Sequence, residues 1–190
     1  LFSQHLNSVG IDFGGYMIRT PKTAKTGDTY NPYIEGSSNL VGLTYERRIT
    51  NTLSLRSGGY LNKQFNSIVS VHVPLEVNGK LIGGKSESMF YAGYACGMSF
   101  NFNRFVVTGF EFPAPNTNSE VDIKKDFYIA PHAGINAGVL IGRFDLKLQG
   151  LFHFLIPEIV DFTTTYQDIS ESNTNGNIGL SIRIGGAYWF

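Results

Sequence analysis

Apolar and polar residues alternate one by one along the last segment of the chain, residues 177–190, and this alternation limits the possible folds. A period of two is the pattern of a β-strand whose two faces meet different surroundings. One face is almost wholly apolar, and the other carries amide, hydroxyl and guanidinium groups. The apolar face consists of Ile178, Leu180, Ile182, Ile184, Tyr188 and Phe190, and the polar face includes Asn177, Ser181 and Arg183.

The same alternation recurs along the chain and predicts eight strands. Each predicted strand is long enough to cross a membrane at a tilt, because about 9–11 residues suffice. An even number of strands places both termini at the same end of the molecule. The predicted strands are residues 6–18, 39–49, 53–63, 68–77, 89–103, 127–141, 144–156 and 177–190.

Composition indicates that the apolar face points outward into lipid. Charged residues make up 16% of the chain, against about 25% in soluble domains, and the polar faces are sparse and rich in glycine. No apolar run approaches the ~18 residues of a transmembrane helix, so any spanning is done by strands. Lys plus Arg equals Asp plus Glu, 15 each, which argues against a nucleic-acid partner. We therefore predict one all-β domain over residues 1–190, an eight-stranded antiparallel transmembrane β-barrel.

The connections alternate between short and long, as they do in outer-membrane barrels. The short ones are Thr50–Thr52 and the pair Gly142-Arg143, and the long ones are residues 19–38, 104–126 and 157–176. Residues 64–67 and 78–88 fit this alternation less well. We predict short periplasmic turns, longer extracellular loops and an integral location in the outer membrane of a Gram-negative bacterium. Residues 1–4 are compatible with the remnant of a signal peptide.

An eight-stranded barrel has an interior only wide enough for side chains, so an open pore is not expected. Buried charges must be paired and hydrogen-bonded, and the three-residue turn at 50–52 sets Glu46 opposite Arg56. We predict a structural polar core, with a proton or ion path as the alternative. Because alternate residues of each strand point inward, the predicted interior contains four acidic and four basic residues. They are Asp12, Glu46, Glu76 and Asp145 against Arg48, Arg56, Lys147 and Arg183.

Histidines add a second feature to the predicted interior. A two-residue turn at Gly142-Arg143 places His132 opposite His153, and two imidazoles in contact are able to share a metal or a proton. The sequence places no third ligand and completes no hydrolytic triad. We therefore predict no catalytic residue, metal or cofactor and interpret the pair, like His72, as structural. A lipid-modifying site and a bound metal are the alternatives.

Three stretches resemble the PorT-like family of small eight-stranded outer-membrane barrels, which are similar in shape to OmpA and OmpX. They are GLTYERRITNTLSLRSGGYL, the pair VSVHVPLEV and FYAGYACGMSFNF with its mid-strand Pro74, and the aromatic terminal strand. The resemblance covers nearly the whole chain. It implies that Tyr188 and Phe190 form the signal by which the barrel assembly machinery recognises its substrate. Trp189 is expected beside them in an aromatic girdle at the membrane interface.

The long loops carry apolar residues that exposed loops usually lack, and contiguous apolar patches mark interfaces. We predict a non-enzymatic accessory subunit of an envelope complex that docks other outer-membrane or periplasmic proteins through these loops. The simpler alternative is that the apolar loop residues pack on one another in an extended ribbon. A lipid-modifying enzyme, an adhesin and a narrow channel remain alternative functions. The predicted docking residues are Phe105, Phe110, Phe112, Ile159, Phe162 and Tyr166.

Overall fold

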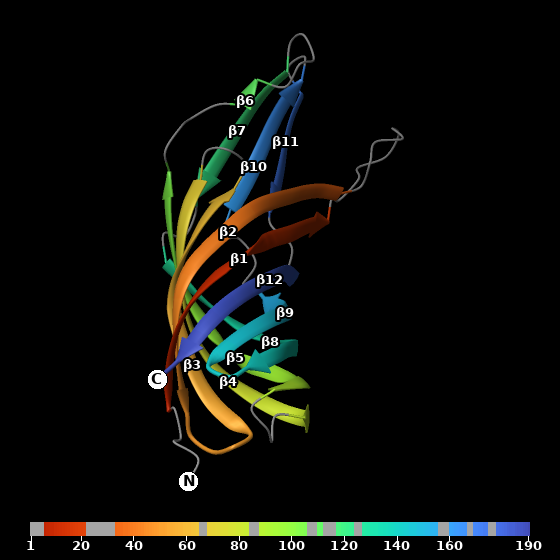
Figure 1. Ribbon diagram of the computed structural model, residues 1–190. Helices are drawn as coiled ribbons and strands as arrows, with labels where there is room; N and C mark the ends of the chain where they lie inside the picture. Colours follow the sequence, from red (N-terminus) through yellow and green to blue (C-terminus); the bar gives the residue numbers. More distant parts are fainter. Residues whose placement is uncertain are drawn as a thin grey trace.

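Eight strands close into an antiparallel barrel in the computed structural model (Figure 1). Neighbours follow the order β1-β12-β9-β8-β5-β4-β3-β2, and β2 pairs with β1 to close the ring. The predicted fold class is confirmed. Among the described residues no helix is long and apolar enough to cross a membrane. The structure describes residues 6–21, 33–64, 68–83, 88–105, 110–111, 117–123, 127–155, 160–166, 169–174 and 178–190.

The barrel strands follow the predicted segments, and several extend beyond them. β8 has the predicted bounds, whereas β2 begins at Tyr33 rather than at residue 39 and β4 ends at Gly83 rather than at residue 77. The predicted connections 19–38 and 78–88 were therefore too long. The strands are β1 (Asn7–Pro21), β2 (Tyr33–Arg48), β3 (Leu53–Gln64), β4 (Ile68–Gly83), β5 (Ser88–Phe105), β8 (Phe127–Ile141), β9 (Phe144–Phe154) and β12 (Ile178–Trp189).

Two short turns set the register of the strands they join. The backbone amides of Ile49 and Thr50 donate to the carbonyl of Leu53 over 2.9 and 3.0 Å, and the β2–β3 register follows. Gly142 has a φ of 58°, in the left-handed region that favours glycine, and joins β8 to β9 through a two-residue turn. β1 begins and β12 ends at the turn end of the barrel, the lower end in Figure 1.

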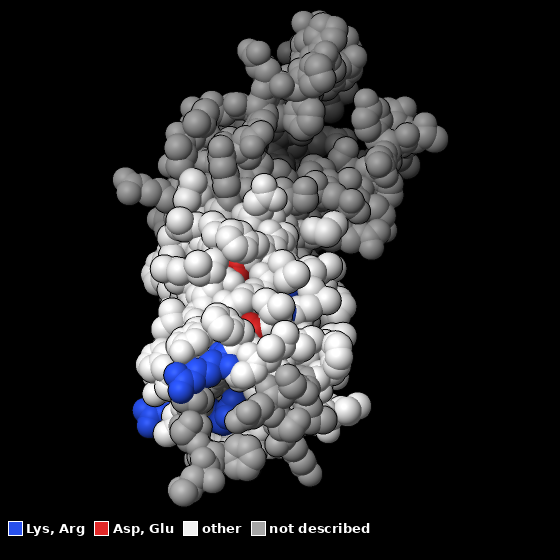
Figure 2. All heavy atoms as spheres, viewed as in Figure 1, with Lys and Arg blue, Asp and Glu red and all other residues white. Residues whose placement is uncertain are grey.

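The outer face of the barrel is apolar, as the alternation predicted. Side chains of β8 are exposed and buried in turn along most of the strand, and the other barrel strands behave similarly. Figure 2 shows this surface as mostly uncharged. Soluble monomers rarely expose contiguous apolar patches above a few hundred Å², so this surface requires lipid. Its large exposed members include Val9, Ile11, Phe13, Leu43, Leu61, Leu75, Phe90, Ile135, Leu146, Phe152, Ile182 and Ile184.

A second sheet extends from the rim opposite the turns, where the sequence predicted loops and, as the alternative, an extended ribbon. It has the order β11-β10-β7-β6 (Figure 1). β7 (Thr117–Ile123) and β6 (Phe110–Glu111) come from residues 104–126, while β10 (Val160–Tyr166) and β11 (Ile169–Thr174) come from residues 157–176. The segments are rich in Thr, Ser and Asn and alternate weakly, so the sequence showed them only as loops. β7 and β10 pair with each other and join the two connections into one sheet.

Candidate functional site

The barrel interior holds the polar network, and the structure places all of the predicted interior residues there. Nine of them are buried, and Arg48 and Lys147 are half-buried near the turn end. They come from seven of the eight barrel strands, because alternate residues of each strand point inward. The set is Asp12, Glu46, Arg48, Arg56, His72, Glu76, His132, Asp145, Lys147, His153 and Arg183.

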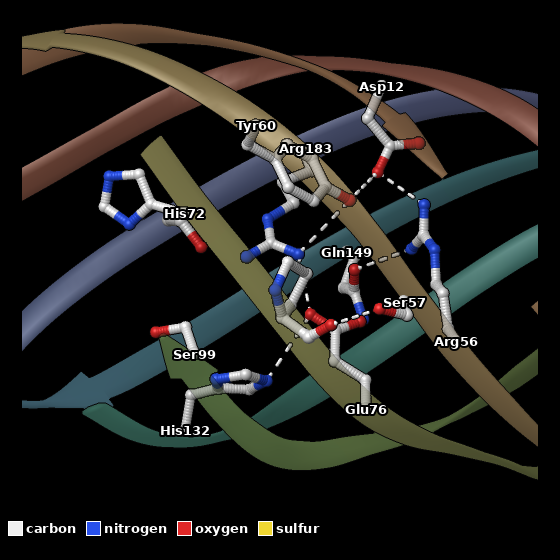
Figure 3. Close-up of polar contacts among 12 residues, drawn as sticks. Asp12, Arg56, Ser57, Tyr60, His72, Glu76, Ser99, His132, Gln149 and Arg183 are labelled. Atoms are coloured by element: carbon white, nitrogen blue, oxygen red, sulfur yellow. Dashed lines mark hydrogen bonds and ion pairs between the residues drawn. The ribbon is translucent and has the colours of Figure 1, made fainter. Parts of the chain in front are cut away.

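Two ion pairs lie at the centre of the interior, and Gln149 links them (Figure 3). Arg56 on β3 contacts Asp12 on β1. Arg183 on β12 donates to Glu76 on β4 over 2.7 Å. Gln149 on β9 accepts from Arg56 at 3.0 Å and donates to Glu76 at 3.3 Å. Side chains from five strands thus form one hydrogen-bonded unit, which we call the central cluster.

Tyr60 completes the central cluster, although it was not among the predicted interior residues. Its hydroxyl donates to Asp12 Oδ2 over 2.6 Å, and the Arg183 guanidinium lies 4.5 Å from its ring centre. The Asp12 carboxylate therefore receives two donors, and the Arg183 charge also meets an aromatic face. An aromatic residue in a barrel strand is usually lipid-facing, so only its shared parity with Arg56 indicated an inward position.

Glu46 and Arg56 are register partners as predicted, but the expected ion pair between them is wrong. Glu46 accepts from Lys147 Nζ over 2.6 Å and from the Ser54 hydroxyl, while Arg56 contacts Asp12. Lys147 lies on β9, which does not adjoin β2 in the sheet. In a narrow closed barrel, side chains from distant strands meet in the lumen and compete with the cross-strand neighbour.

Trp189 points into the barrel, which corrects its predicted place in the aromatic girdle. It is 3% exposed, and its Nε1 lies 3.4 Å from Asp145 Oδ2. The Arg48 guanidinium lies 4.5 Å from the Trp189 ring centre. Tyr91 donates to Asp145 over 2.7 Å and lies beneath the Lys80 ammonium. Trp189 is an even number of residues from Arg183 and therefore lies on the same, inward face of β12, but its aromatic neighbours suggested the lipid side. Lys80 was missed because it lies beyond the predicted end of its strand.

The predicted histidine pair is present, with His132 and His153 in register and their ring centres 5.2 Å apart. His153 Nε2 lies 2.8 Å from the Ser181 hydroxyl, and His132 Nε2 lies 3.4 Å from Glu76 Oε1. The contact with Glu76 connects the pair to the central cluster (Figure 3). The Ser181 contact is a hydrogen bond, whereas both ring nitrogens of His132 are buried without a hydrogen-bond partner among the described residues.

His72 is held separately from that pair. Its ring nitrogens contact Asn101 and Asn62. Tyr16 packs between it and His153, with ring-centre distances of 5.6 and 5.1 Å. Within the residues that the structure describes, no group of three or more His, Cys, Asp or Glu is arranged to hold a metal ion.

The predicted docking residues that the structure describes lie at the end of β5 and in the second sheet. Phe105 ends β5, Phe110 begins β6, and Phe162 and Tyr166 belong to β10. Phe112 and Ile159 lie outside the described residues, as do residues 1–4. The two residues of the predicted assembly signal, Tyr188 and Phe190, are 40% and 53% exposed on the lipid side of the β12 end.

Solved structures with the same fold are outer-membrane proteins. The outer membrane protein OprG from Pseudomonas aeruginosa is 8% identical, with a TM-score of 0.56 over 97% of this chain and 96% of that chain. Neisserial surface protein A (NspA) is 11% identical, with a TM-score of 0.54 over 97% of both chains. At these identities the likeness extends to the fold alone. No family model and no curated protein matches the chain.

Barrel closure, the apolar exterior and the shared fold lead to the same conclusion. Closure satisfies every strand edge within the membrane, as a lipid-embedded sheet requires. The exterior is suited to lipid, and the interior binds its own charges. The chain is an integral eight-stranded transmembrane β-barrel with the fold of outer-membrane proteins.

Proposed function

We propose that the protein is a non-enzymatic interaction subunit of an envelope complex, and that it docks other outer-membrane proteins through the second sheet. The observation that carries the proposal is the β7–β10 ladder. Seven register pairs, from Val160↔Ile123 to Tyr166↔Thr117, join the two longest connections into a single platform. Loops positioned by a rigid scaffold are common binding surfaces, and a joined pair loses less conformational entropy on binding than two separate loops.

The order of the second sheet supports a particular way of docking. β11 lies at one edge, and among the described residues it pairs only with β10. In an antiparallel ladder, alternate residues of an edge strand direct their N–H and C=O groups away from the sheet. An extended segment of a partner is able to add to such an edge through main-chain hydrogen bonds.

The choice of envelope complex rests on the resemblance to PorT-like barrels, which supports a place in secretion or outer-membrane assembly machinery. The aromatic end of β12 supports recognition by the barrel assembly machinery during biogenesis. The role needs no catalytic residue and no cofactor.

The test replaces Phe110, Phe112 and Phe162 together with Ser in the full chain. Co-purification from mild-detergent extracts, quantified by mass spectrometry, should lose the stoichiometric partner. The heat-modifiable folded form should persist, because the replaced residues lie outside the barrel strands. Tyr30→Ser, in the connection between β1 and β2, is the matched control and should retain the partner.

Three results would overturn the proposal. One is a triple variant that keeps every partner of the parent. Another is loss of the folded barrel, which would show that these residues pack within the protein's own hairpins. The last is a partner-free parent that hydrolyses lipid, which would support the enzymatic alternative.

A further inference from the structure

Cations gather on the outer surface at the turn end of the barrel. Arg47 follows the exposed Tyr45 on β2, and Arg143 lies in the β8–β9 turn beside Phe144. Both arginines are exposed, and both lie close to the turns that join β2 to β3 and β8 to β9. Figure 2 shows Lys and Arg gathered near this end of the described surface.

The carboxylates at this end are directed inward and are engaged there. Glu46 accepts from Lys147, and Asp145 accepts from Tyr91. No ion pair among the described residues includes Arg47 or Arg143. The outward positive charge is therefore uncompensated by the described carboxylates of the chain.

An aromatic hydroxyl holds one of the two arginines at the membrane surface, and a second tyrosine lies near the other on β2. Arg143 Nη1 donates to the Tyr188 hydroxyl over 3.2 Å, and the Tyr188 ring packs edge-on against Phe144 at 5.2 Å. The Tyr45 hydroxyl donates to Asn7 Oδ1 over 2.7 Å. Tyrosines with an apolar body and a polar tip are the residues that occupy the headgroup level of a bilayer.

The register places two strands, β1 and β12, between the backbones of the two arginines. Arg47 on β2 is the register partner of Asn7 on β1. The Asn7 amide donates to the Phe190 carbonyl, just beyond the end of β12. The Trp189 amide of β12 then donates to the Arg143 carbonyl. Three interstrand steps separate their backbones by roughly 14 Å along the barrel wall. That spacing allows contact with separate phosphate groups along one arc of the membrane surface.

We propose that Arg47 and Arg143, the second held by Tyr188, bind the phosphate groups of anionic phospholipids in the leaflet that surrounds the turn end. Each guanidinium is able to donate two parallel hydrogen bonds to a phosphate. A basic residue near an anionic surface favours binding on the order of fivefold. The proposal is independent of the second sheet, which lies at the opposite rim.

The experiment uses the folded full chain in neutral detergent with added phosphatidylglycerol or phosphatidylethanolamine, and native mass spectrometry counts bound lipid. Phosphatidylglycerol should be preferred by the parent. The preference should fall on the order of fivefold for each arginine removed in Arg47→Gln/Arg143→Gln. Lys22→Gln/Lys25→Gln removes the same charge from the connection between β1 and β2 and should leave the preference unchanged.

Four results would overturn the lipid site. One is equal binding of the two lipids by the parent, and another is a glutamine variant that retains the preference for phosphatidylglycerol. Millimolar inorganic phosphate displacing the lipid would also contradict it, as would a glutamine variant that releases a bound acidic protein but binds lipid as the parent does. If the glutamine variant does not fold, Arg47→Lys/Arg143→Lys keeps the charge but loses the paired donor geometry. A preference in that variant as strong as the parent's would also contradict the proposal.

Discussion

Arg56 shows how a single buried charge selects its partner inside the barrel. Its cross-strand neighbour is Glu46, yet it contacts Asp12, while Glu46 contacts Lys147. Removing one member of a buried pair leaves an uncompensated charge and costs about 3–5 kcal/mol, whereas replacing both members costs much less. The ion pairs are therefore better understood as a fixed set of contacts than as independent stabilising terms.

Double-mutant cycles should detect this selection. We expect Arg56→Met to lower the free energy of unfolding by about 3–5 kcal/mol. We also expect the Asp12→Asn/Arg56→Met cycle to show a coupling of at least about 1 kcal/mol. Urea titrations followed by fluorescence of Trp189, the one tryptophan in the sequence, measure both. The control cycle Glu46→Gln/Arg56→Met should show a smaller coupling energy than the Asp12 cycle. A larger coupling energy in the control cycle would mean that Arg56 pairs with Glu46 and not with Asp12.

At the scale of the strands, the wall of the barrel varies in how tightly its backbones approach. A Cβ added to Gly134 on β8 would lie 1.9 Å from the Gly150 carbonyl oxygen, but one added to Gly150 would meet nothing within 4 Å.

The pairing of β3 with β4 is interrupted. The register runs from Leu53↔Gly79 to Ser57↔Leu75 and resumes at Tyr60↔His72. Pro74 lies in this interval without an N–H to donate, and its carbonyl accepts from the Ser57 hydroxyl at 2.9 Å.

The two glycines of the β8–β9 pair make a matched test. Gly134→Ala should lower the free energy of unfolding by about 1–3 kcal/mol, because the backbones must separate. Gly150→Ala should be neutral or stabilise by up to about 1 kcal/mol, because it restricts the unfolded chain without a clash. Urea midpoints of the reconstituted variants measure the difference. Equal effects would mean that the two strands do not approach in this way.

At the scale of the molecule, the strand topology gives the barrel two different rims. The turns at 50–52 and 142–143 share one rim with the start of β1 and the end of β12, and the second sheet extends from the other rim (Figure 1). The central cluster lies between the two rims. The molecule therefore offers a protein-docking surface and a lipid-contacting surface at opposite ends, according to the two proposals above.

Epitope insertion tests this topology in intact cells. An epitope inserted after Asn116, in the connection between β6 and β7, should bind an added antibody. The same epitope inserted after Asn51 should bind only after the outer membrane is permeabilised. Both insertions lie outside the barrel strands, so heat-modifiable mobility confirms folding in each case. Labelling in the reverse order would invert the assigned orientation.

The sequence by itself determined the barrel, because alternation with a period of two is a local property that survives in any register. It also determined both turns, and with them the opposition of Glu46 to Arg56 and of His132 to His153. These conclusions needed only neighbouring strands and the length of the turn between them.

Only the tertiary structure decided which charges meet and how the longest connections are organised. Asp12 and Arg56 belong to strands that are not adjacent in the sheet, and Lys147 reaches Glu46 across the lumen. The β7–β10 ladder likewise joins segments far apart in the chain. Closure of the sheet brings such groups together, and no local pattern records the distances that closure creates.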